Sequence, residues 1–297
     1  MNGNWYRLLN TTAGLCGAWL FTVVSRIIAA GFFVFSSRVP ESRRFYAVLY
    51  PERSRLYHLW CTFVQYQNFT TIHFDRFLAA RKTSVSFTSS GWEKLAEVIG
   101  NQGGILLMSH LGNWEIAATL LKQQRDDLQL LLYMGIKEKE GIERVQKEEL
   151  RRSGVTIIGA DQHSSSPFSA VEGIRFLQAG GLVSMAGDIV WRDDQRRVRV
   201  NFLGHDAYLP EAPFVFALVS GAPLFVFFAF RTGRNSYHFT LSDPIEILPA
   251  SRRERREAIA HAAQQYADFL EQALRHHPFE WYHFDRFLWN EIKDGVA

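Results

Sequence analysis

Residues 104–121 read GILLMSHLGNWEIAATLL. The run 104–109 is apolar up to its last residue, which predicts a short strand buried on both faces. Gly112 and Asn113 are residue types that favour a loop leading into a helix, and the apolar spacing that follows predicts a helix over about 113–124. A buried strand followed at once by a helix is typical of an α/β sheet covered by helices.

The same alternation continues on the carboxyl side of this stretch. Apolar runs predict further strands at 128–134, 155–158, 182–186, 198–203 and 223–230, with one or two more in 237–248. Helical spacing is found between them, at about 140–152, 168–178, 210–220 and 252–276. The sequence therefore predicts an α/β fold with a mixed, mostly parallel central sheet flanked by helices.

The N-terminal part has a different texture. Residues 11–37 are apolar or small except for Arg26, and this length suits a bilayer span. Three interpretations stay open: the segment spans a membrane, lies in the interface with Arg26 reaching water, or forms a buried core helix. A long amphipathic helix is expected over about 52–81. We therefore expect a membrane-associating helical segment over 1–90 and a catalytic domain over 91–297.

Composition limits the classes of function. The chain has 297 residues, 47% of them hydrophobic and 14% aromatic, with a formal net charge of only +3. So small a positive charge, without a nucleic-acid-binding motif, argues against nucleic acid as a partner. Cys16 and Cys61 are far apart, so neither a disulfide scaffold nor a cysteine metal cluster is expected, and a reducing compartment is favoured.

His110 and Glu115 are the candidate catalytic pair. Within one regular helix a spacing of five residues turns two side chains away from each other, so they can meet only if His110 lies in the loop and Glu115 in the first helical turn. A histidine held by a carboxylate has a fixed tautomer and can act as a general base. No GxSxG motif for a serine nucleophile is present, so direct transfer is favoured over a covalent acyl-enzyme.

The motif HLGNWE (110–115) resembles the HxxxxD/E motif of the lysophospholipid acyltransferase superfamily, and most closely that of bacterial late lipid A acyltransferases. The resemblance extends over about residues 100–290. It includes Gly187-Asp188 after a predicted strand, Pro210 before a helix, and the closing segment HPFEWYHFDRFLW at 277–289.

The resemblance implies transfer of a fatty acyl chain from acyl carrier protein, or acyl-CoA, to a hydroxyl of a membrane lipid, such as a lipid A precursor or related glycolipid. It implies His110 as general base and Glu115 as its orienting partner, with Asn113 and Asp188 lining the site. It implies no metal or redox cofactor. The expected location is the cytoplasmic face of the cell inner membrane.

Two arginines are further candidates for substrate binding. Arg192 follows the predicted Asp188 strand, and its guanidinium could bind an acceptor phosphate or the acidic carrier protein. Arg152 lies near a predicted helix end, where the family resemblance implies phosphate-binding arginines. The alternatives are a solvated hairpin for Arg192 and a favourable interaction with the helix dipole for Arg152. Other functions also stay open: a polyene, amino-acid or lysophospholipid acceptor, transfer to water by the same pair, or a catalytically idle, membrane-bound interaction protein.

Overall fold

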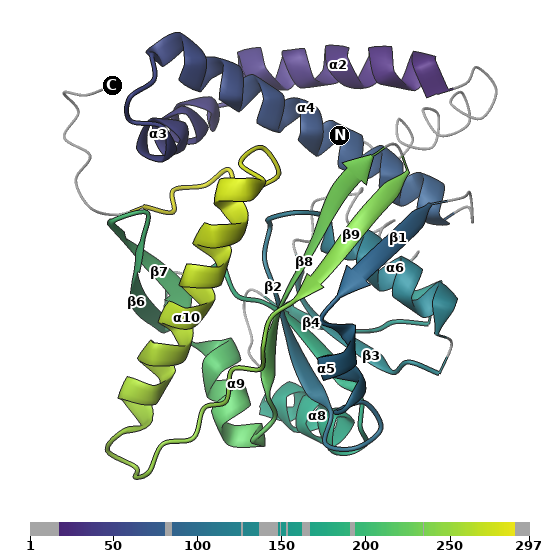
Figure 1. The fold of residues 1–297 in the computed structure, drawn as a ribbon, viewed down its shortest axis with the longest axis vertical. Coiled ribbons are helices and arrows are strands. Elements are labelled where there is room, and N and C mark those ends of the chain that lie inside the picture. Colours follow the sequence, from purple (N-terminus) through teal and green to yellow (C-terminus); the bar gives the residue numbers. More distant parts are fainter. Residues whose placement is uncertain are drawn as a thin grey trace.

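A seven-stranded sheet forms the centre of the fold (Figure 1). The computed structural model describes residues 18–80, 85–125, 127–136, 148, 150–152, 154–161, 167–190, 194–233 and 235–288. The strand order is β1-β9-β8-β2-β5-β3-β4. The strands are β1 (Ser86–Ser90), β2 (Gly104–Met108), β3 (Leu130–Ile136), β4 (Thr156–Asp161), β5 (Leu182–Ala186), β8 (Leu224–Gly233) and β9 (Ser236–Leu241).

The sheet is mixed and mostly parallel, as predicted. Parallel pairing joins β1 to β9, β8 to β2, β2 to β5, β5 to β3 and β3 to β4. The β8–β9 pair is antiparallel. Because β2 lies between β5 and β8 in the middle of the sheet, its carboxyl end is flanked by elements on both sides.

Side chains of β2 alternate between two apolar cores, which explains why the whole strand is buried. Ile105 and Leu107 point into one core, together with residues of α9 (Ala212–Ser220) and α10 (Arg255–His276). Leu106 and Met108 point into the other, with residues of α6 (Trp114–Gln124). A continuous apolar run is therefore required here, whereas a strand with one solvated face would alternate.

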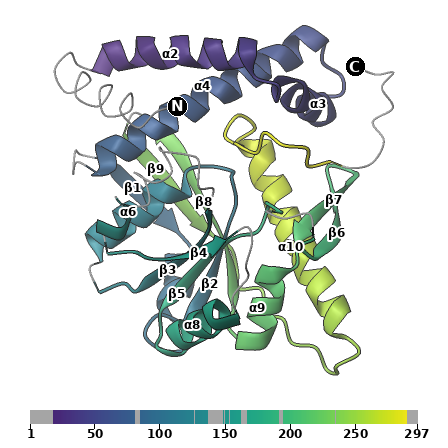
Figure 2. The ribbon, with the colours of Figure 1, turned by 180° about the vertical axis from the view of Figure 1, so that it is seen from behind.

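The remaining elements of this part surround the sheet (Figure 2). An antiparallel hairpin contacts α10 and is formed by β6 (Arg197–Phe202) and β7 (His205–Pro210). Helices α5 (Trp92–Ala96) and α8 (Pro167–Gln178) also belong to this part.

Three helices, which we call the helical layer, lie together at one end of the sheet in both views (Figures 1 and 2). They are α2 (Ala18–Phe35), α3 (Val39–Leu49) and α4 (Arg55–Ala80), and α4 contacts both of the others as well as α6. Within the described residues, none of the helices alone meets the length and hydropathy needed to cross a membrane. The bent pair Val23–Phe35 and Val39–Leu49, with 93° between its halves, meets them together.

Most of the predicted elements are confirmed, including the long helix that becomes α4. The charged helix expected at 140–152 falls largely outside the described residues. β1 and β7 were not predicted, because SFTSS in β1 is mostly exposed and polar and HDAYLP in β7 has no apolar run. β1 belongs to the expected 1–90 segment, yet it forms the edge strand of the central sheet, where it pairs with β9.

Candidate active site

The candidate site lies where two neighbouring strands end. β2 and β5 run in parallel, with Met108 opposite Ala186 in the register. His110 and Asp188 each follow two residues later, so they leave the same edge of the sheet side by side. This edge, at the carboxyl ends of the strands, is where ligand sites gather in α/β sheets.

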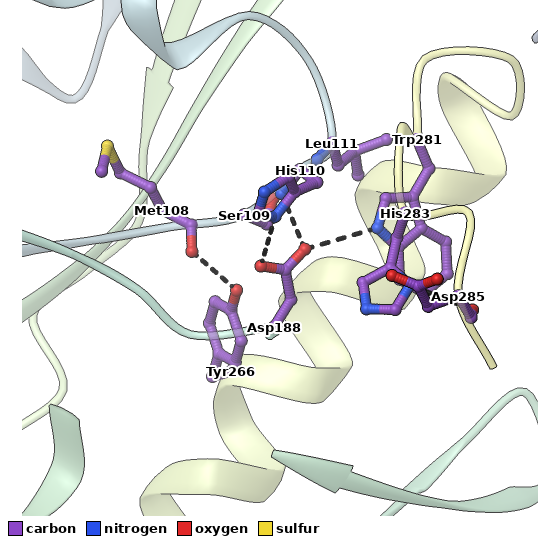
Figure 3. A network of polar contacts seen from close by, with 9 residues as sticks. All are labelled: Met108, Ser109, His110, Leu111, Asp188, Tyr266, Trp281, His283 and Asp285. Atoms are coloured by element: carbon purple, nitrogen blue, oxygen red, sulfur yellow. Dashed lines mark hydrogen bonds and ion pairs between the residues drawn. The ribbon is translucent and has the colours of Figure 1, made fainter. Parts of the chain in front are cut away.

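Asp188 binds both the side chain and the backbone of His110 (Figure 3). The Nδ1 atom of His110 lies 3.0 Å from Oδ1 of Asp188, and the backbone N–H of His110 donates to Oδ2 at 2.7 Å. The indole Nε1–H of Trp281 also donates to Oδ2, at 3.4 Å. The Asp188 side chain is fully buried, whereas that of His110 is 27% exposed, so the imidazole is the member of the pair that a substrate can reach.

This contact fixes the tautomer of His110. A carboxylate accepts hydrogen bonds, so Nδ1 carries the proton that it shares with Asp188. The second ring nitrogen, Nε2, is then left with a lone pair. A histidine in this state can accept a proton from a hydroxyl, and the imidazolium that forms stays beside a negative charge.

The electrostatics of the pair favour the charged forms of both groups. Burial opposes the His110 imidazolium, but the charge and hydrogen bond of Asp188, with a further contribution from the charge of Glu115, outweigh it and raise the pKa of His110. Burial likewise opposes the Asp188 carboxylate, yet the charge and hydrogen bonds of His110 lower the pKa of Asp188. Asp188 therefore stays ionised while His110 exchanges protons.

The loop that carries His110 is fixed by hydrogen bonds to distant segments. The backbone carbonyl of His110 accepts from the N–H of Tyr282, and the N–H of Gly112 donates to the carbonyl of Glu280. Gly112 has φ of +82°, and a Cβ atom there would lie 2.4 Å from the carbonyl oxygen of Ala229. Glycine is required at 112 because any side chain would clash with β8.

Glu115 lies in the first turn of α6, where the sequence placed it, and forms an ion pair with an arginine of the helical layer. Its Oε2 lies 3.0 Å from Nη1 of Arg76, and both side chains are 13% exposed. The Nε–H of Arg76 also donates to Oδ1 of Asn113, at 2.8 Å. The guanidinium thus joins two residues of the HLGNWE motif.

These contacts change the roles that the sequence suggested. The position of His110 in the loop is as expected, but the carboxylate bonded to its Nδ1 belongs to Asp188 and not to Glu115. Asp188 was expected only to line the site. Asn113, within the motif, is fully buried between Arg76 and Tyr237. The spacing within one segment could not reveal Asp188 as the partner, because the contact joins residues 78 positions apart.

Comparison with known families gives the context for this geometry. Residues 67–289 match the family model for bacterial lipid A biosynthesis acyltransferases. The chain belongs to this family. The match covers the end of α4, the whole sheet and the closing segment, and so includes every residue of the site described above. A comparison with curated protein sequences finds no match.

Within this lipid A acyltransferase family member, the structure describes one of the two arginines predicted to bind substrate. Arg152 is exposed to solvent on the segment that precedes β4. Arg192 lies outside the described residues, so its binding role stays a prediction. In the part of the chain that the structure describes, no group of three or more His, Cys, Asp or Glu side chains is arranged to hold a metal ion.

His283 is a site residue that the sequence reasoning missed. Its ring lies edge to face with that of His110, with 6.3 Å between the ring centroids, and it also contacts the ring of Trp281. Burial lowers the pKa of His283, because it outweighs the opposing charge of Asp188. The only signal for this residue was its place in the segment 277–289, which carried part of the family resemblance but suggested no individual roles.

Proposed function

We propose that this chain transfers a fatty acyl group from acyl carrier protein or acyl-CoA to a hydroxyl of a lipid A precursor or related glycolipid. The observation that supports it best is the His110–Asp188 pair, which leaves Nε2 of His110 as a base on a partly exposed side chain. Membership of an acyltransferase family supports acyl transfer as the reaction. The family name also favours a lipid A type of acceptor.

The proposed reaction needs one base and no covalent enzyme intermediate. Nε2 of His110 accepts the proton of the acceptor hydroxyl while the hydroxyl oxygen attacks the carbonyl carbon of the thioester. The C–O bond forms, the carbonyl oxygen becomes an oxyanion, and the C–S bond then breaks. The imidazolium returns the proton to the thiolate that leaves, so His110 ends in its initial state. Asp188 stabilises the imidazolium between these two proton transfers.

Glu115 has a different place in this scheme. Its charge acts on His110 from α6, and it is fixed by Arg76 rather than by the imidazole. Its role as a catalytic residue stays a prediction. The scheme requires only that Glu115 remains ionised near a site that becomes positive when His110 is protonated.

We further propose that the helical layer places the site at the cytoplasmic face of the inner membrane. Large apolar side chains of α2 and α4 are exposed, among them Ile27, Val34 and Phe35 of α2 and Leu56 and Trp60 of α4. Burial of such side chains in the interfacial region of a bilayer is favourable. The arginines that follow α2 favour a cytoplasmic location for the rest of the chain, namely Arg38, Arg43, Arg44, Arg53 and Arg55.

Comparison of lipid extracts by mass spectrometry tests the proposed function. Cells that express the wild type should contain a lipid heavier by one acyl chain, and its parent mass identifies the acceptor. This species should be missing with His110→Ala at equal protein level. The matched control is His261→Ala, because His261 is exposed on α10 and lies far along the chain from the motif.

An assay with the purified chain separates transfer from hydrolysis. Acyl carrier protein or coenzyme A charged with a fatty acid is supplied with and without the lipid extract, and free thiol and free fatty acid are measured. Thiol release that depends on the lipid supports transfer. Equal release of thiol and free fatty acid without lipid would instead show a hydrolase, and no release with any donor would contradict acyl-group chemistry.

A further inference from the structure

Two adjacent residues of α4, Asp75 and Arg76, are linked to the amide of Asn113, Arg76 directly and Asp75 through Tyr237. Arg76 donates to the Oδ1 atom of Asn113, and the Nδ2 atom of Asn113 donates to the hydroxyl of Tyr237, at 3.2 Å. That hydroxyl in turn donates to Oδ2 of Asp75, at 2.6 Å. Hydrogen bonds thus link Arg76 to Asn113, Asn113 to Tyr237 and Tyr237 to Asp75. Because Asp75 and Arg76 are neighbours on α4, these residues form a ring between α4, β9 and the loop that carries the catalytic histidine.

The ring is buried and its polar groups are satisfied. Asp75 is 1% exposed, and its Oδ2 also accepts from the Nε–H of Arg231, at 2.8 Å. Burial and the nearby carboxylate of Asp75 raise the pKa of Tyr237, so its hydroxyl remains a donor. Asn113 precedes α6 but its side chain does not cap that helix. Its amide is instead used to bind Arg76 and Tyr237, which fixes the loop against α4.

Arg76 extends from this ring to the charge next to the base. Its Nη1 atom pairs with Glu115 while its Nε is held by Asn113, so one planar guanidinium sets the position of both side chains. A lysine could not make these two contacts in the same geometry, because its single ammonium has no fixed fork. A purely structural ion pair would join α4 to α6 anywhere along their contact, whereas this one lies within the HLGNWE motif.

We propose that Arg76 is a positioning residue of the transfer reaction, which orients Asn113 and Glu115 and so sets the charge that surrounds His110. This inference rests on the function proposed above. It makes the end of α4 a part of the active site, although the sequence assigned that helix to a membrane-associating segment. Arg76 acts through other residues and has no assigned contact with substrate.

Four groups from four elements act on the charge of His110. Asp188 follows β5, Glu115 lies on α6, Arg76 on α4, and His283 in the closing segment. The two carboxylates favour the imidazolium, and the guanidinium opposes it. Removal of Arg76 and removal of Glu115 should therefore shift the pKa of His110 in opposite directions.

The test measures the pKa of His110 by NMR titration of the histidine ring protons in the full chain, with the His110 signal assigned from His110→Ala. We expect Arg76→Gln to raise this pKa and Glu115→Gln to lower it. Arg44→Gln is the matched control, because Arg44 belongs to the same helical layer and pairs with Glu41 at the surface of α3. It should leave the pKa unchanged.

Activity adds a second, separate readout. Arg76→Lys keeps the positive charge but not the fork, so it should retain the pKa of His110 and still lower kcat by about 10²-fold through misplacement, with little change in KM. Thermal unfolding of each variant checks that it is folded.

The possible outcomes are distinct. A folded Arg76→Gln whose His110 pKa does not rise, or an Arg76→Lys with wild-type kcat, would overturn the inference. If Arg76→Gln and Glu115→Gln shift the pKa of His110 in opposite directions but the wild type transfers no acyl group from any donor, the role of Arg76 at His110 is supported and the proposed reaction is rejected.

Discussion

The helical layer and the sheet distribute polar groups in different ways. In the sheet, the strands are apolar inside, and buried polar side chains are found mainly where β2 and β5 end. In the helical layer, buried polar side chains lie among buried apolar ones along all three helices, and α2 exposes large apolar side chains. The buried polar side chains of the layer are Ser25, Ser42, His58, Thr62, Gln65 and Asp75.

The difference indicates how the layer is attached. The amide of Gln65 donates to the carbonyl of Trp281, and that of Asn68 donates to the carbonyl of Phe279. Both acceptors belong to the closing segment, which also supplies the indole that contacts Asp188. The layer is therefore joined to the active site by specific hydrogen bonds, while the exposed apolar side chains of α2 remain available to a different environment. Hydrogen bonds of this kind fix orientation more strictly than apolar packing does.

The largest expected effect concerns the polar end of the sheet. Asp188→Asn keeps the size of the side chain but removes the charge that stabilises the imidazolium of His110, and its amide can favour the wrong tautomer. We expect kcat to fall by about 10²–10⁴-fold. Measurement of the transfer rate with saturating donor and lipid checks this, and thermal unfolding shows whether the variant is folded.

The pH dependence of the residual activity gives the sign of the interaction. Asp188 contributes to the raised pKa of His110, so its removal lowers that pKa. The acidic limb of kcat/KM, which reports deprotonation of His110, should move to lower pH in Asp188→Asn. A movement to higher pH, or an unchanged rate, would contradict the assignment of Asp188 as partner of the base.

The second-largest expected effect is on membrane binding by the exposed apolar side chains of α2. The double variant Ile27→Asp/Val34→Asp places two charges on the exposed face of α2. Each apolar side chain contributes about 1.5–3 kcal/mol when it is fully removed from water, so we expect at least about tenfold weaker binding to vesicles of phosphatidylethanolamine and phosphatidylglycerol. Sedimentation of the full chain with these vesicles measures it.

The control for this prediction is another exposed apolar residue. Leu248 is 75% exposed but lies outside the helical layer, in the segment between β9 and α10. Leu248→Asp should bind vesicles as the wild type does. Equal binding by all three proteins would show that α2 does not provide the membrane contact.

Much of the fold followed from the sequence because the signals were local. The buried run 104–108 and the helix after it form β2 and α6 as predicted, and the apolar run 182–186 is β5. β1 could not be recognised in the same way. Its polar, mostly exposed residues give no apolar pattern, and it is a strand only because β9 pairs with it.

The candidate site was predicted in part for the same reason. His110 and Glu115 belong to one motif, so their positions in the loop and first turn could be deduced from spacing and glycine placement. Asp188 as the partner of His110 depends on the register of β2 against β5, and Arg76 on the docking of α4. Contacts between segments so far apart in the chain require knowledge of the packing.

The smallest effect tests the junction between the two regions. Tyr237→Phe removes the hydroxyl that links Asp75 of the helical layer to Asn113 of the catalytic loop, and leaves the aromatic ring in the core. The loss of a buried hydrogen bond to a carboxylate should lower the free energy of unfolding by about 1–3 kcal/mol. Urea denaturation monitored by circular dichroism measures this change.

The control is Tyr208→Phe, on the partly exposed hairpin strand β7, which should change stability less. Phe239→Tyr is unsuitable as a control because the ring of Phe239 is buried. If Tyr237→Phe were as stable as the wild type, the polar junction would not hold the layer to the sheet, and apolar contacts around Trp281 would have to account for the attachment.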